Sequence, residues 1–155
     1  MATKADFTLE EWETLLSTPV AAGMLVVIAD MHVAGLLREF EAMESAEADA
    51  STAGAAHDLV EALIADMKPY DDDKDTETSG EDARLEYLAV LRAAAGIVDG
   101  KCSPDEAVGY KQWIIATAQA TAEASKEGGF LRRKRPTVSE QEAAEIREIR
   151  ATLGF

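Results

Sequence analysis

A short acidic turn holds the side chains best suited to chemistry. Asp99 and Gly100 end one predicted helix, and Ser103, Asp105 and Glu106 open the next. Carboxylate and hydroxyl oxygens gathered in a tight loop are ligands that hard divalent cations prefer. We therefore predict a divalent-cation site at Asp99, Ser103, Asp105 and Glu106, with Ca²⁺, Mg²⁺, Mn²⁺ and Zn²⁺ all open. The alternative is structural, because glycine ends helices and acidic residues favour the positive end of the next helix dipole.

A second candidate group lies near a predicted helix end. Asp30, His32 and Glu39 are residue types that serve in metal binding or acid–base chemistry. They need a pocket between helices that brings them together. Otherwise His32 is a cap or surface residue, as we expect for His57 on the polar side of its helix.

The segment 70–80 is acidic and lacks aliphatic residues, and we predict an exposed, mobile loop. Its oxygen-bearing residues, together with the first residues of the next helix, fall at the six ligand offsets of an EF-hand loop: Asp71, Asp73, Asp75, Glu77, Ser79 and Asp82. Thr76 stands where that loop needs glycine, so a solvated charge run is the favoured interpretation.

Two further features invite a chemical interpretation. Cys102, the one cysteine, precedes a helix start, which lowers a thiol pKa, but the neighbouring acids raise it, so we expect an incidental cysteine. Arg132–Arg135 is a basic patch in the predicted linker 130–138. Residues 130–155 carry six Lys or Arg against four Asp or Glu, whereas the whole chain carries 15 against 30. We expect this basic patch to dock on the acidic remainder of the chain or on a neighbouring subunit. The alternative is that it binds phosphate or nucleic acid.

Helix signals dominate the whole chain. Capping boxes are predicted at Thr8–Glu11, Ser103–Glu106 and Ser139–Glu142. Thr18-Pro19 looks like another helix start, which separates a short helix ending near Ser17 from an apolar one ending near Asp30. No run of alternating β-branched residues occurs. We predict an all-α bundle of about seven helices in a single domain, residues 1–155, with the linker leading to a C-terminal helix.

Composition narrows the function classes. The formal net charge of −15 disfavours nucleic acid and anionic membranes as partners. The most apolar stretch, Val20–Ala29, is too short to span a bilayer, and the N-terminus lacks an apolar signal region. No phosphate loop, dinucleotide fingerprint or hydrolase motif is present. We expect a cytoplasmic protein without a transmembrane segment.

The turn also resembles a known family. A long helix, then Asp99-Gly100, then Ser103-Pro104 and Glu106 opening another helix, is similar to the bacterial tellurite-resistance TerB-like domain. That resemblance implies an all-helical fold and two acidic turns, related by an internal repeat, that bind divalent cations. The first repeat would align the segment ending at Asp30 with the segment ending at Asp99. There Met31 replaces the glycine, and only Asp30 and Glu39 remain as ligands.

Three functional hypotheses follow. The first is a non-enzymatic helical interaction domain, cation-modulated and stress-related, as the resemblance implies. The second is a ligand-free scaffold that self-associates through its C-terminal helix, so that the partner is a protein or a second copy. The third is a small-molecule-binding or enzymatic bundle that uses Asp30, His32 and Glu39.

Overall fold

The prediction of an all-α fold is confirmed. A computed structural model describes residues 1–30, 36–68, 80–124 and 139–155, and no strand occurs within these ranges. The described elements are two 3-10 segments, η1 (Lys4–Asp6) and η3 (Ala50–Ala56), and six α-helices: α1 (Leu9–Asp30), α2 (Leu36–Glu47), α3 (His57–Asp66), α4 (Glu81–Lys101), α5 (Pro104–Ala124) and α6 (Glu140–Leu153). The predicted loop 70–80, Gly80 apart, and the linker 130–138 lie outside the described residues.

The predicted number of about seven helices is not matched, because α1 continues through Thr18-Pro19. A proline inside a helix has no N–H to give to the carbonyl four residues earlier. Here that carbonyl belongs to Leu15, and the hydroxyl of Tyr110 on α5 donates to it at 3.0 Å. Thr18 Oγ1 donates to the Thr14 carbonyl at 2.7 Å. Packing against α5 therefore supplies the donor that Pro19 lacks, and the helix does not end.

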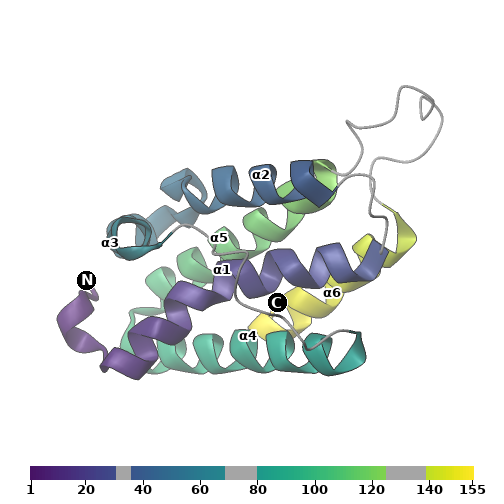
Figure 1. Cartoon of the computed structure of the whole chain (residues 1–155). Coiled ribbons are helices and arrows are strands. Elements are labelled where there is room, and N and C mark those ends of the chain that lie inside the picture. The colour runs from purple at the N-terminus through teal and green to yellow at the C-terminus, as the bar shows by residue number, and fades with distance from the viewer. Residues whose placement is uncertain (31–35, 69–79, 125–138) are drawn as a thin grey trace.

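The helices form a bundle around two long central elements. Figure 1 shows α1 and α5 between α2 on one side and α4 on the other, with α6 packed against α1, α4 and α5. The largest fully buried side chains come from all of these layers and include Trp113, Tyr110, Leu25, Leu91 and Ile149. The C-terminal helix therefore contributes to the core of its own chain.

The predicted capping boxes are confirmed. Glu11 accepts from Thr8 N at 2.7 Å, and Glu142 accepts from Ser139 N at 2.9 Å. The reciprocal bonds to the threonine and serine hydroxyls are also present. Each box satisfies amide groups that a helix start leaves without an intrahelical acceptor.

The segment η3 lies directly on α5, and a glycine permits this approach. A Cβ on Gly109 would collide with the Ala53 carbonyl and lie 2.9 Å from Ala56 N. Within η3, Gly54 has φ 53° and ψ −120°, a conformation that side chains with a Cβ rarely adopt. These two glycines bring η3, and with it α3, against the centre of the bundle.

Because α1 is continuous, its apolar part is longer than the sequence pattern indicated. Leu9–Ala29 is long and apolar enough to cross a membrane by length and composition, with a mean hydropathy of 1.5, and half of it is buried inside the structure. Core helices of soluble proteins and signal sequences have the same properties, so this segment alone does not assign the protein to a membrane.

Candidate functional site

The predicted cation turn lies between α4 and α5, and Glu106 acts there as a cap. Its carboxylate accepts from Ser103 N at 2.9 Å and from Ala2 N at 2.8 Å. The backbone hydrogen bond from Ser103 is the main reason that the pKa of Glu106 is lowered, against the opposing effect of burial. The Glu106 side chain thus caps the N-terminus of α5 and holds the N-terminal segment of the chain against that helix.

The other predicted ligands of this turn are arranged separately. Asp99 pairs with Lys111 of α5, whose Nζ lies 2.7 and 2.8 Å from the two carboxylate oxygens. Ser103 Oγ accepts from Glu106 N at 3.3 Å, and Asp105 is exposed. Among the described residues, no three or more His, Cys, Asp or Glu side chains form a group that would hold a metal ion. The cation site stays a prediction, and Asp99 and Glu106 already have protein partners.

The described cysteine is half-buried among acidic residues, and the described histidine is a surface residue. Burial, followed by the charge of Glu106, raises the pKa of Cys102 to about 11. His57 is exposed, with Nε2 3.7 Å from Glu61 and Nδ1 3.5 Å from Asp58. Cys102 is therefore in a setting that disfavours the thiolate, as the neighbouring acids indicated.

Several predicted residues lie outside the described part of the chain. They are the side chain of Asp30, the residue His32, the side chain of Glu39, the loop residues from Asp71 to Ser79, and the basic patch Arg132–Arg135. The predictions made for them stay predictions.

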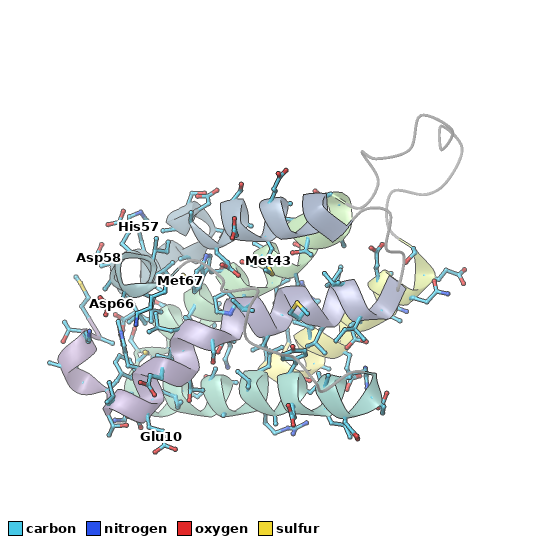
Figure 2. All side chains as sticks on the ribbon, in the orientation of Figure 1. Glu10, Met43, His57, Asp58, Asp66 and Met67 are labelled. Atoms are coloured by element: carbon cyan, nitrogen blue, oxygen red, sulfur yellow. The ribbon has the colours of Figure 1, made fainter. Side chains whose placement is uncertain are left out.

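A pocket that the sequence analysis did not single out lies where α2 and α3 meet α1. It has a cavity volume of about 740 Å³ and is open to solvent. Figure 2 shows Met43 on α2, and Asp66 and Met67 at the end of α3, on the side that faces α1. The apolar lining consists of Leu16, Val20, Met43, Ile64 and Met67. Its acidic lining consists of Glu13, Glu44, Glu47 and Asp66, and the remainder of Ser17, Ala48 and Lys68.

Glu47 is the unusual member of this lining. Its side chain is only 9% exposed, and its Oε1 has no hydrogen-bond partner. Burial, with a smaller contribution from the charge of Glu44, raises the pKa of Glu47 to about 7. A buried carboxyl oxygen without a partner is costly, so its place on a pocket wall calls for a functional explanation.

The backbone adds negative potential at the same place. Glu47 is the last residue of α2, and Asp66 is the last residue of α3. The carboxyl end of a helix carries roughly half a negative charge, from carbonyl groups that have no intrahelical partner. The pocket thus lies at two negative helix ends, with acidic side chains added to both.

The remaining charged groups at the pocket are less available. Asp66 accepts from Lys4 Nζ at 2.6 Å and from Trp12 Nε1 at 2.9 Å, and these bonds lower its pKa. Glu13 and Glu44 are exposed on α1 and α2. Glu47 is therefore the acid of this lining that combines burial with an oxygen that has no hydrogen-bond partner.

One signal in the sequence pointed to Glu47. In the sequence, Phe40 and Met43 are apolar residues at helical spacing, and Glu47 follows Met43 by one helical turn. An acidic residue that continues an apolar stripe is placed toward a core. Met43 itself packs on Gly23 of α1, where a Cβ would collide with the methionine sulfur.

Comparisons with protein-family models, with curated proteins and with solved structures give no match for this chain. They neither support nor contradict the TerB-like resemblance.

Proposed function

We propose that this chain is a non-enzymatic helical binding domain that takes its ligand in the pocket between α1, α2 and α3. The observation that supports the proposal most is Glu47, a nine-tenths-buried residue of the pocket lining whose Oε1 has no hydrogen-bond partner in the structure. Oε1 is closed to solvent, so the Glu47 side chain must shift toward the pocket before a ligand can donate to this oxygen and remove the cost of leaving it unsatisfied.

The size and lining of the pocket favour a small molecule. Small-molecule sites are concave, enclose roughly 300–1,000 Å³, and combine apolar walls with a few polar groups. The volume of about 740 Å³ falls inside this range. Met67, which is half-buried, supplies a flexible, polarisable side chain that adapts to the shape of a ligand.

The proposal also covers the location, partner and cellular role of the protein. We keep the cytoplasmic location, the protein partner or homo-oligomer and the stress-related role expected from the sequence. Modulation by a divalent cation at the Asp99–Glu106 turn is a separate hypothesis and does not involve the pocket.

Fluorescence titration with the neutral probe N-phenyl-1-naphthylamine tests the proposed site. We expect a saturable rise in fluorescence with the wild-type protein. Ala48→Trp places a large ring on an exposed position of the pocket wall. This variant should weaken probe binding by about tenfold or more, equivalent to ~1.4 kcal/mol.

The matched control is Ala93→Trp, which adds the same ring at an exposed position of α4. This control should bind the probe as the wild-type protein does. If the probe does not bind the wild-type protein, or if both variants bind it equally well, the proposed site is wrong.

A further inference from the structure

We propose that the ligand of the α1–α2–α3 pocket is an organic cation, with a protonated amine that pairs with Glu47 and an apolar chain that packs on Leu16, Val20 and Met67. This inference depends on the proposed function, because it names the chemical class that the same pocket takes.

The sign of the ligand's charge follows from the pocket wall. Glu13, Glu44 and Glu47 line the pocket, and the ends of α2 and α3 add to the negative potential, whereas the charge of Asp66 is offset by Lys4. Lys68 is the one basic residue in the described lining, and it is exposed. A carboxylate or phosphate ligand would be repelled here, whereas a cation lowers the free energy of every nearby acid.

The position of Glu47 specifies where the ammonium group lies. A protonated amine has three N–H donors, and one of them can satisfy Oε1 once the Glu47 side chain turns this oxygen, now closed to solvent, toward the pocket. A hydrogen bond between two charged groups is roughly twice as strong as a neutral one. Glu47 therefore gains both a partner and a counter-charge from an ammonium ion, whereas an alcohol supplies only the hydrogen bond.

The apolar lining distinguishes an organic cation from a metal ion. Leu16, Val20, Ile64 and Met67 are half-buried and supply apolar surface in the same lining as the acidic residues. A metal ion requires several oxygen ligands around one point, and among the described side chains no group of three acids, histidines or cysteines provides them. An alkyl chain, by contrast, gains roughly 0.8 kcal/mol for each CH₂ group that it buries.

Calorimetric titration with three ligands of equal chain length tests the inference: n-octylamine, n-octanol and sodium octanoate. Near pH 8, where Glu47 is mainly ionised, we expect the amine to bind about tenfold or more tightly than the alcohol, and the octanoate to bind most weakly. Preference for the alcohol or the octanoate would overturn the inference.

The key variant is Glu47→Gln, which keeps the shape of the side chain and removes its charge. We expect the affinity for n-octylamine to fall by ~10- to 100-fold, the loss typical of a hydrogen bond between charged groups. The affinity for n-octanol should change by less than about threefold, because glutamine still accepts a hydrogen bond. An equal loss for both ligands would contradict the pairing of the amine with Glu47.

The control is Glu41→Gln, which removes the same charge from an exposed position of α2 outside the pocket lining. It should leave the amine affinity within about threefold of wild type, as expected for a distant, screened charge. If Glu41→Gln and Glu47→Gln weaken the amine equally, the attraction is general and the inference fails.

The two proposals fail in different ways. If N-phenyl-1-naphthylamine binds and Ala48→Trp blocks it, but n-octylamine binds no better than n-octanol, the pocket is a binding site and the cationic ligand is wrong. If neither the probe nor the amine binds the wild-type protein at millimolar concentration, both proposals are wrong.

Discussion

At the scale of single residues, the hydrogen-bond donors around a buried carboxylate decide whether it stabilises or destabilises this chain. Glu106 is buried but accepts two backbone N–H groups, and its pKa is lowered. Glu47 is buried to a similar extent, has no such donors on Oε1, and has a raised pKa. The same side chain type is thus a stabilising cap in one place and a source of instability in the other.

Glu47→Gln should stabilise the protein in a pH-dependent way. The pKa of Glu47 is about 7 in the folded state against 4.5 for an ordinary glutamate, so the folded protein holds a proton that the unfolded chain has lost. Stability attributable to this group therefore falls as pH rises from about 4.5 to about 7, and stays low above that. We expect a gain of ~1–3 kcal/mol near pH 8 and almost none near pH 5.

Thermal unfolding measures this difference, because each kcal/mol shifts Tm by about 2–4 °C in a chain of this size. Glu13, Glu44, Asp66 and Lys68 face the same pocket and are unchanged in the variant, so the difference from wild type reports Glu47. A gain that is the same near pH 5 and pH 8 would show that removal of a charge from an acidic protein, and not the titration of Glu47, is responsible.

At the scale of elements, one hydrogen bond from α5 explains why α1 is a single helix. The Leu15 carbonyl has lost its intrahelical donor because residue 19 is proline, and the Tyr110 hydroxyl takes that role. Tyr110 is fully buried and Leu15 is also buried, so neither group has water as a substitute. The continuity of α1 therefore depends on its packing against α5.

Tyr110→Phe should destabilise the protein by ~1–3 kcal/mol, because it leaves the Leu15 carbonyl without its donor. In a Pro19→Ala background, the alanine N–H can donate to that carbonyl, and the cost of Tyr110→Phe should fall by about 1 kcal/mol. Chemical denaturation of the four proteins of this double-mutant cycle measures the coupling. An equal cost in both backgrounds would mean that the hydroxyl acts elsewhere.

At the scale of the whole molecule, the sequence predicts most of the fold because caps and apolar periodicity are local. The starts of α1, α5 and α6 follow from capping boxes, which need only residues three positions apart. The continuity of α1 through Pro19 was not predictable in this way. The donor that replaces the absent proline N–H is the Tyr110 hydroxyl, 95 residues from Leu15 in the sequence. The pocket was not predictable either, because its walls come from three helices that are brought together only in the folded chain.

The hypotheses of self-association and cation binding also belong to the whole molecule. Ile149 and Leu153 of α6 are buried within the chain, so removal of residues from 130 onward would disturb the core as well as any dimer. The oligomeric state of the intact protein, measured by light scattering, is the better readout for self-association. Glu106 is also a poor choice of variant for testing cation binding. It caps α5, so its substitution would lower stability even if no metal binds.

A sharper variant for the cation turn is Lys111→Met. In the structure Lys111 occupies both carboxylate oxygens of Asp99, so a cation must compete with it. If the turn binds Ca²⁺, Mg²⁺, Mn²⁺ or Zn²⁺, the chelator-treated variant should show a larger, saturable rise in Tm than wild type at the same cation concentration, because ligand binding stabilises the folded state by mass action. Asp99→Asn, which keeps the shape of the side chain, should abolish that rise in both proteins. A flat response of wild type and Lys111→Met to all four ions at millimolar concentration would leave the turn as a helix cap and N-terminal anchor, with the pocket beside Glu47 as the one proposed ligand site.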